Sequence, residues 1–377
     1  MKLTLVITNL ATGGAEMMLH KLLQNIDRSR FQPTVISLMG KGEIGPRIEA
    51  LGIPVHALGM RRGVPNPLVV FRLARLLRHL QPDVVHTWMY HADLLGGLAA
   101  RLAGCDRVVW CLRHSNLSKT ENKRSTLAVV RLCARLSGWV PRLIVSCSHR
   151  ARQVHDAVGY VDEKIQVIPN GFDLGRFIPD AAARVRVRAE LGLPHDAPLV
   201  GVVARYDVQK NHLGLVQAAA QVLAQLPQVH FVLAGKDVDG GNAELQAAIA
   251  AHPGLAAHMH LLGRRDDVPQ LMAALDVLAS PSHGEAFPNV LGEAMACGAP
   301  CVVTAAGDSA EIVGSTGRVV AVGDMRGLAR ELVAVLHLPV EERVALGRQA
   351  RARVQAEYEI GHVTRLYEAV YERVAAQ

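Results

Sequence analysis

Short runs of β-branched and other apolar residues alternate with Ala- and Leu-rich stretches along the whole chain, and this alternation restricts the fold more than any other feature. The runs of the first half are residues 3–7, 34–37, 84–85, 108–111 and 143–146. Those of the second half are residues 199–203, 230–234, 260–262, 277–279 and 301–304. Strands alternating with helices form a parallel sheet covered by helices. The pattern predicts an α/β protein with two Rossmann-like, doubly wound domains facing across a cleft.

The expected boundary between the domains is a stretch rich in turn signals. Val167 to Asp173 reads Val-Ile-Pro-Asn-Gly-Phe-Asp, and Pro179 follows. Pro and Asn-Gly interrupt regular structure. We therefore expect an N-terminal domain over residues 1–178, a C-terminal domain over residues 179–356, and a final helix in residues 357–377 that packs back on the N-terminal domain. A length of 377 residues suits two domains of ordinary size.

Charge is distributed unevenly between the two halves. The formal net charge is +7, but residues 1–178 contain 24 Lys/Arg and 12 Asp/Glu, whereas the remainder contains 17 and 22. A nucleic-acid-binding protein is the alternative that this basicity suggests. Aromatic residues make up only 4% of the chain, and no recognised nucleic-acid motif is present. Two surfaces with different partners explain the distribution better, and no nucleic-acid partner is expected.

The cysteines and the apolar segments indicate a cytoplasmic protein. The six cysteines form no Cys-x-x-Cys pair, so we expect reduced, buried thiols rather than disulfides or a zinc site. No uncharged apolar stretch reaches the length of about 18 residues that a membrane-spanning helix needs. Peripheral association with the inner face of the cell membrane remains compatible with this composition.

The segment from Ser280 to Gly298 carries the most chemical information. It follows an apolar run, passes through a loop and opens a helix near Pro288, so its N–H groups and helix dipole favour an anion such as a phosphate. Glu285 lies in the loop and Glu293 in the helix, which indicates different roles for the two carboxylates. The alternative is an ordinary loop acid and an ordinary surface acid. The remaining candidates for donor binding in this segment are Gly284, Ala286, Phe287, Pro288, Asn289 and Val290.

Two further loops have the composition of phosphate-binding sites. Arg205 and Lys210 lie in one loop after the run 199–203, where they can stabilise a departing diphosphate; a solvated basic loop is the alternative. Gly13 and Gly14 follow the first run, and glycines there let a backbone approach a ligand closely. The segment is neither a Gly-x-Gly-x-x-Gly turn nor a P-loop, and a plain tight turn is equally compatible with it.

Three histidines of the first half follow apolar runs and are expected at the carboxyl edge of a sheet, where ligands bind in α/β proteins. They are His86, His91 and His114. A buried or loop histidine bonded to the backbone is the alternative for each. The histidines lack metalloprotease spacing, so no metal site is expected.

Taken together and in this order, these motifs resemble the retaining nucleotide-sugar glycosyltransferases of family 4, which have the GT-B fold. Glu285 and Glu293 fit the family's pair of Glu residues separated by seven others, and the resemblance extends over essentially the whole chain. The family more often has Gly before the Arg and after the Lys of the basic loop, where this chain has Ala204 and Asn211.

The resemblance implies transfer of a sugar, expected from a UDP-sugar, to a hydroxyl of a glycan or lipid-linked acceptor in cell-surface polysaccharide synthesis. In this assignment Arg205, Lys210, Glu285 and His114 are catalytic. Arg264, in the loop of residues 263–268, belongs to the expected base pocket, whereas His86 and His91 are candidates for the acceptor side. No cofactor or metal is expected. A nucleotide-sugar epimerase or a sugar phosphorylase with the same fold is the alternative enzyme.

Basic residues near the expected acceptor side indicate one further partner. Arg72, Arg75 and Arg78 are spaced three apart in the helical stretch 67–80, and Arg61, Arg62, Lys119, Lys123 and Arg124 lie in neighbouring segments. Such a partly amphipathic, basic face suits an anionic membrane surface. A helix that packs on the sheet and leaves its arginines in solvent is the alternative.

Overall fold

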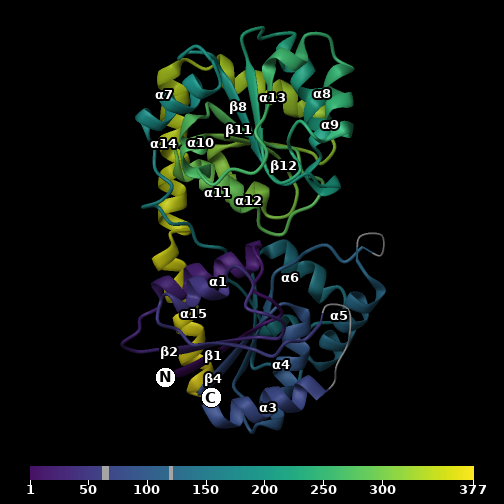
Figure 1. Cartoon of the computed structure of the whole chain (residues 1–377), viewed down its shortest axis with the longest axis vertical. Coiled ribbons are helices and arrows are strands. Elements are labelled where there is room, and N and C mark those ends of the chain that lie inside the picture. Colours follow the sequence, from purple (N-terminus) through teal and green to yellow (C-terminus); the bar gives the residue numbers. More distant parts are fainter. Residues whose placement is uncertain (62–67, 119–121) are drawn as a thin grey trace. The chain divides into compact units, whose positions relative to one another are not determined.

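The computed structural model describes residues 1–61, 68–118 and 122–377. The chain forms two compact units, each built around a parallel β-sheet with helices on its faces (Figure 1). Unit 1 consists of Met1–Gly171 and Ile360–Gln377, and unit 2 consists of Phe172–Glu359. Arg62 and Lys119 of the expected basic face, and Pro67 at the start of its helical stretch, lie outside the described residues.

Unit 1 contains a seven-stranded parallel sheet in the order β3-β2-β1-β4-β5-β6-β7. Its strands are β1 (Lys2–Ile7), β2 (Gln32–Ser37), β3 (Val55–Ala57), β4 (Val84–Trp88), β5 (Val108–Leu112), β6 (Leu143–Ser146) and β7 (Ile165–Val167). Its helices are α1 (Gly14–Asn25), α2 (Gly45–Glu49), α3 (Leu68–Leu80), α4 (Tyr90–Leu102), α5 (Arg124–Leu136), α6 (His149–Asp156), the 3₁₀ turn η1 (Asp162–Lys164) and α15 (Ile360–Ala375).

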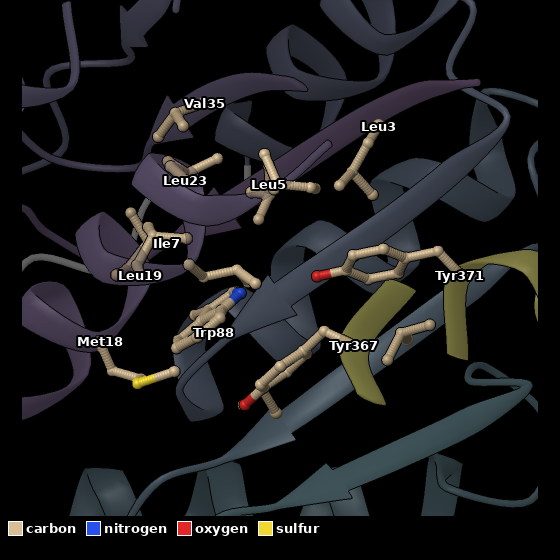
Figure 2. Close-up of a cluster of buried hydrophobic side chains, with 14 of the residues drawn as sticks. Leu3, Leu5, Ile7, Met18, Leu19, Leu23, Val35, Trp88, Tyr367 and Tyr371 are labelled. Atoms are coloured by element: carbon tan, nitrogen blue, oxygen red, sulfur yellow. The ribbon is translucent and has the colours of Figure 1, made fainter. Parts of the chain in front are cut away.

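Both faces of this sheet are covered, which is why its strands read as nearly continuous apolar runs. Leu3, Leu5 and Ile7 point to one face, where α1, α2 and α15 complete the core. Val6 points to the opposite face, which packs against α3, α4 and α5. Figure 2 shows the first of these cores, with the α15 residues Tyr367 and Tyr371 beside Trp88.

Unit 2 contains a six-stranded parallel sheet in the order β10-β9-β8-β11-β12-β13. Its strands are β8 (Leu199–Val203), β9 (His230–Ala234), β10 (Met259–Leu261), β11 (Val277–Ser280), β12 (Cys301–Thr304) and β13 (Arg318–Val320). Its α-helices are α7 (Ala181–Glu190), α8 (His212–Leu223), α9 (Ala243–Ala250), α10 (Val268–Ala274), α11 (Asn289–Ala296), α12 (Ser309–Val313), α13 (Met325–His337) and α14 (Val340–Glu357). The 3₁₀ turns are η2 (Val208–Lys210), η3 (Leu255–His258) and η4 (Gly314–Thr316).

A buried carboxylate organises the end of this sheet where β11 begins. Asp276 is almost completely buried and accepts hydrogen bonds from the guanidinium of Arg188 at 2.7 Å and of Arg184 at 2.8 Å. It also accepts the backbone N–H of Leu199 at 2.9 Å. Arg188 is itself buried, so the charges of this cluster compensate each other away from water. The cluster fixes α7 to the beginnings of β8 and β11.

The chain passes between the units beside Gly171 and Phe172, slightly before the boundary expected at residue 178. Phe172 belongs to unit 2 because its ring lies 6.2 Å from that of Phe287 and its backbone N–H donates to the carbonyl of Tyr358. Within unit 1, Gly171 lies so close to Ile360 that a Cβ would come within 2.5 Å of that side chain. The last helix, α15, therefore begins at Ile360 and completes the core of unit 1.

Within the described part of the chain, none of the helices combines the length and the apolar character needed to cross a membrane. All six cysteines lie within the described residues and none forms a disulfide; five of them are buried.

Candidate active site

Three loops of unit 2 meet at the carboxyl edge of its sheet. They follow β8, β11 and β12, which are neighbours in the sheet order. Because all strands are parallel, their carboxyl ends lie at one edge, where open α/β sheets bind ligands. The first loop carries Arg205 and Lys210, the second carries Glu285, and the third carries Gly307. The sheet therefore brings together residues that are far apart in the sequence.

An ion pair joins the first two loops. The Lys210 ammonium donates to Glu285 Oε1 at 2.5 Å, and the hydroxyl of Ser282 donates to the same oxygen at 2.8 Å. The side chains of Lys210 and Glu285 are only 20% and 10% exposed. Partial burial strengthens such a charge-assisted bond and holds both groups in one geometry. Two residues that the sequence analysis assigned to separate loops are therefore directly bonded in the structure.

Backbone hydrogen bonds fix the loop that carries Lys210. Asp207 accepts the N–H of Gln209 at 3.0 Å, and the carbonyl of Gln209 accepts the N–H of His283 at 2.7 Å. Asn211 has a left-handed backbone with φ of 54°, and its side chain caps α8 by accepting the N–H of Gly214. Asn tolerates this conformation better than other side chains do. This accounts for Asn211 at a position where the family more often has Gly.

Arg205 lies at the exposed end of the same loop. Its Nε and Nη2 donate to Asp207 Oδ2 at 3.1 Å and 3.0 Å, so its guanidinium is oriented although it is mostly exposed. An exposed ion pair of this kind contributes little to stability. Arg205 is therefore able to exchange Asp207 for another anion at small cost.

The third loop, which follows β12, contacts the main chain around Glu285. Gly307 has φ of +57°, and a Cβ there would come within 2.3 Å of the carbonyl oxygen of Glu285. The N–H of Asp308 donates to the carbonyl of Ala286 at 3.2 Å, and the Thr304 hydroxyl donates to the carbonyl of Ser282 at 2.5 Å. The main chain around Glu285 is thus held by β12 and by the turn that follows it.

Helix α11 begins directly after this loop, at Asn289, with Pro288 at its N-cap. The first N–H groups of any helix lack intrahelical acceptors and carry the positive end of the dipole, which favours an anion. Phe287 anchors the turn because its ring packs 6.2 Å from Phe172 and 5.8 Å from Tyr358. Glu293 lies in the second turn of α11 and is half-buried. The donor-binding candidates Gly284, Ala286 and Val290 belong to the same loop and helix start.

Arg264 is exposed in the loop after β10. Its neighbour Arg265 is instead bound by two carboxylates, with Nη2 3.0 Å from Glu190 Oε2 and Nε 2.7 Å from Asp267 Oδ1. Arg265 therefore has a structural role, whereas the side chain of Arg264 is accessible to a ligand.

In unit 1, the glycine loop lies at the start of α1. Gly13 is the N-cap, and a Cβ there would come within 2.5 Å of the Glu16 carboxylate, which folds back toward it. Burial raises the pKa of Glu16, although the nearby Arg113 partly opposes this shift. Gly13 thus leaves room for an internal carboxylate, a requirement that the spacing of the two glycines did not reveal. Gly14 is the first residue of the helix.

Two of the three histidine candidates lie at the carboxyl edge of unit 1's sheet. His91 is in the first turn of α4, and burial lowers its pKa. His114 follows β5 and is half-buried. Arg113, beside it, donates to Asn170 Oδ1 at 2.6 Å and lies over the ring of Trp88. Sequence reasoning did not single out Arg113, although it stands next to His114 after a predicted strand.

His86 is corrected by the structure. The sequence analysis ended the strand at Val85 and placed His86 beyond it, but β4 continues to Trp88 and His86 is completely buried within it. Its Nδ1 lies 2.9 Å from the hydroxyl oxygen of Tyr371 on α15. Burial lowers the pKa of His86 to about 3. His86 is therefore a neutral core residue and is removed from the acceptor candidates.

Sequence reasoning also gave no role to Ser282, whose hydroxyl orients Glu285. The available signal was its position in the same loop, three residues before the carboxylate that it binds.

Comparisons with known proteins identify the family. Residues 12–176 match Glycosyltransferase Family 4, and residues 197–337 match Glycosyl transferases group 1. The chain is 34% identical over 314 residues to D-inositol 3-phosphate glycosyltransferase of Mycobacterium avium (strain 104), covering 77% of this chain and 69% of that protein. The chain belongs to the family 4 glycosyltransferases.

Other relatives of this glycosyltransferase indicate the class of donor. It is 33% identical over 236 residues to UDP-Gal:alpha-D-GlcNAc-diphosphoundecaprenol alpha-1,3-galactosyltransferase of Escherichia coli, spanning 62% of this chain and 60% of that enzyme. A crystal structure of Anabaena Alr3699/HepE in complex with UDP superposes with a TM-score of 0.86 at 25% identity, covering 99% of this chain and 100% of that one.

These similarities confirm the predicted family and the GT-B fold. The glycosyltransferase is thus an enzyme of a retaining family that uses nucleotide-sugar donors. The loops around Lys210 and Glu285 fall within the matched range 197–337, and Gly13, His91 and His114 fall within 12–176.

Proposed function

We propose that this glycosyltransferase moves a hexosyl group from a UDP-sugar to a hydroxyl of a glycan or lipid-linked acceptor in the synthesis of a cell-surface polysaccharide. UDP is the nucleotide bound in the HepE crystal structure, and an undecaprenol-linked sugar is the acceptor named for the Escherichia coli relative. The proposed enzyme is cytoplasmic and peripheral to the inner face of the membrane.

The observation that carries the proposal is the Lys210–Glu285 pair, 2.5 Å long, at the edge of the sheet from which α11 begins. A diphosphate donor presents an anion next to a sugar, and this site presents a cation next to a carboxylate. The ammonium suits the phosphate, and the carboxylate suits the sugar carbon that becomes positively charged as its bond to the diphosphate breaks.

In the proposed mechanism, Arg205 and Lys210 hold the diphosphate, assisted by the N–H groups at the start of α11. Arg205 offers a forked guanidinium, and Lys210 a compact charge. Binding the departing diphosphate more tightly than the intact donor lowers the barrier, because only interactions that strengthen in the transition state accelerate the reaction. A phosphate oxygen of the leaving group accepts the acceptor's proton as the hydroxyl attacks from the same face. The cations neutralise the phosphates, so no metal ion is required.

Glu285 positions the sugar, and Ser282 positions Glu285. When Lys210 binds the donor diphosphate, the Ser282 hydroxyl still holds the Glu285 carboxylate in place. We propose hydrogen bonds from the ribose to Glu293 and contact of the base with the loop that contains Arg264. The flanking residues Gly284, Ala286 and Phe287 give the loop its shape.

The residues proposed from unit 1 rest on the family resemblance and on their place at the carboxyl edge of its sheet. Gly13 and Gly14 border the donor phosphates, and His114 bonds the donor sugar. His91 remains a candidate for the acceptor side, since it lies at the same edge and is half-buried.

Thermal shift with UDP-, GDP- and ADP-sugars identifies the donor, since a ligand that binds only the folded protein stabilises it. With the selected donor, Lys210→Ala should weaken nucleotide-sugar affinity roughly 10- to 100-fold, the effect of losing a hydrogen bond to a charged group. Glu285→Gln should leave affinity within a few-fold and lower turnover about 100-fold.

The matched control is Lys236→Ala, which removes an exposed lysine of unit 2 whose ammonium lies 3.9 Å from the carboxylate of its neighbour Asp237. Its affinity and turnover should equal those of the unaltered enzyme. Stabilisation by no nucleotide sugar, or near-normal transfer by both Lys210→Ala and Glu285→Gln, would reject the proposed function.

A further inference from the structure

Helix α3 exposes apolar side chains on the same stripe as its arginines. Leu68 and Phe71 are 64% and 65% exposed. Arg72 and Arg75 follow on this outer stripe, while Leu73 and Leu77 on the opposite side pack into the core of unit 1. A helix that only packed on the sheet would bury its large apolar residues and expose polar ones. Phe71 and Leu68 are therefore unexplained by packing within unit 1.

Helix α5 repeats the arrangement. Arg131, Leu132 and Arg135 are all exposed on its outer side, and Trp139 follows in the turn after the helix with 58% of its surface exposed. Cys133 and Ala134 on the inner side belong to the core. The guanidinium of Arg101, from α4, lies 5.6 Å from the Trp139 ring centroid and leaves much of the indole open.

These helices lie together on one face of unit 1's sheet, with α4 between α3 and α5 (Figure 1). We define the α3–α5 face by the exposed residues Leu68, Phe71, Arg72, Arg75, Arg131, Leu132, Arg135 and Trp139. Among the described residues of unit 1, large exposed apolar side chains occur on or next to α3, α4, α5 and α6, and none occurs on α1, α2 or α15. The opposite layer of the unit lacks this feature.

The charge on the α3–α5 face has one sign. Within helices α3, α4 and α5, the sole carboxyl is that of Asp93, which is buried. Arg72, Arg75, Arg131 and Arg135 form no ion pair with any described residue. The face thus combines unpaired cations with exposed Phe, Leu and Trp side chains, so its partner must offer both anions and an apolar phase.

We propose that the α3–α5 face binds an anionic lipid bilayer, with the arginines on lipid phosphates and Phe71, Leu132 and Trp139 at the headgroup boundary. A bilayer surface supplies dense negative charge for the arginines directly above an apolar layer for the exposed apolar side chains. A second copy of the same face would oppose arginine with arginine. The proposal rests on the peripheral location given in the proposed function and names the surface responsible. It concerns unit 1 alone and needs neither donor nor acceptor, so membrane binding and sugar transfer can fail separately.

Flotation with lipid vesicles tests the proposal on the full-length enzyme, without nucleotide sugar. One vesicle is phosphatidylcholine, and the other contains equal parts of phosphatidylcholine and phosphatidylglycerol. The enzyme should float with the anionic vesicles and stay behind with the neutral ones. Arg75→Gln combined with Arg135→Gln should reduce partitioning roughly 30-fold, from about fivefold per arginine near an anionic surface. Phe71→Ser combined with Trp139→Ser should reduce it at least tenfold.

Matched controls lie in unit 2. Arg326→Gln with Arg330→Gln removes two exposed arginines of α13, and Val340→Ser with Val344→Ser removes two exposed apolar side chains of α14. Both controls should float like the unaltered enzyme, and all variants should keep the unaltered thermal stability, since the replaced side chains are exposed.

Equal recovery with neutral and anionic vesicles overturns the proposal, as does a Phe71→Ser/Trp139→Ser variant that floats normally. Two other occupants would also overturn it. A dimer in light scattering that this variant dissociates would assign the face to a second copy. Salt-sensitive binding of single-stranded RNA that anionic vesicles fail to displace would assign it to nucleic acid.

Discussion

Replacing Gly307 by alanine tests whether the turn after β12 holds the proposed catalytic carboxylate in place. Gly307 has φ of +57°, and an added Cβ would lie 2.3 Å from the carbonyl oxygen of Glu285, where an ordinary contact begins near 3.4 Å. The carbonyl must therefore retreat by about 1 Å, carrying the Glu285 side chain with it. A displacement of this size in a catalytic group lowers turnover about 100-fold.

The same substitution also strains the backbone. The left-handed conformation costs a residue with a Cβ about 1 kcal/mol, and forcing a methyl group into a filled space adds about 2 kcal/mol. Gly307→Ala should therefore lower the free energy of unfolding of unit 2 by about 3 kcal/mol. Urea denaturation measures this loss, and turnover of the donor selected by thermal shift measures the displacement of Glu285.

Gly323→Ala is the matched control, because Gly323 has φ of +84° and no atom within 4 Å of the added Cβ. It carries the backbone strain without the clash, so stability should fall by about 1 kcal/mol and turnover should be unchanged. The reasoning is refuted if Gly307→Ala turns over as fast as Gly323→Ala under conditions where both are folded.

Two predictions concern buried charge. The pKa of His86 is about 3 in the folded protein and 6.5 in the unfolded chain. As the pH drops below 6.5, the unfolded chain therefore takes up a proton at His86 that the folded protein does not, and the free energy of unfolding falls. His86→Phe also leaves the Tyr371 hydroxyl without its His86 partner, so the variant should be less stable than the unaltered enzyme at pH 7. Between pH 7 and pH 5, however, its free energy of unfolding should fall by about 2 kcal/mol less than that of the unaltered enzyme, as urea titrations at each pH would measure. Parallel curves of stability against pH would contradict this. Asp276→Asn removes the negative charge that compensates the buried guanidinium of Arg188. The free energy of unfolding of unit 2 should therefore fall by about 3 kcal/mol in the same assay. A loss below 1 kcal/mol would contradict the charge compensation described for this cluster.

The central strands could be predicted from the sequence because both faces of each sheet are covered. The runs at residues 143–146, 199–203, 230–234 and 301–304 coincide with β6, β8, β9 and β12. The short strands β3, β7 and β13 were not predicted. They lie at or near sheet edges and are partly exposed, as in β13, where only Val320 is buried. A polar residue, His56 or Gln166, interrupts the apolar run in β3 and β7, whereas the apolar run 319–322 at β13 was missed.

The residues proposed for the site were taken from the sequence, whereas the contacts that hold them were not visible there. Parallel strands had to bring Lys210 and Glu285 to one edge, so their proximity followed from the fold. The burial of His86 could not be foreseen, because its hydroxyl partner Tyr371 lies 285 residues away in the sequence. The close approach of Gly307 to Glu285 likewise depends on two loops whose conformations no local pattern specifies.

The position of α15 affects the order in which the chain becomes structured during translation. Residues 360–377 leave the ribosome after unit 2, yet they belong to unit 1, where Tyr367 and Tyr371 cover Trp88 and His86. Unit 2 is continuous from Phe172 to Glu359 and can close its core first. The rest of unit 1 therefore keeps an uncovered aromatic surface until α15 has been synthesised. A premature stop codon before α15 would leave unit 1 without its last helix, although most of unit 1 lies at the opposite end of the sequence.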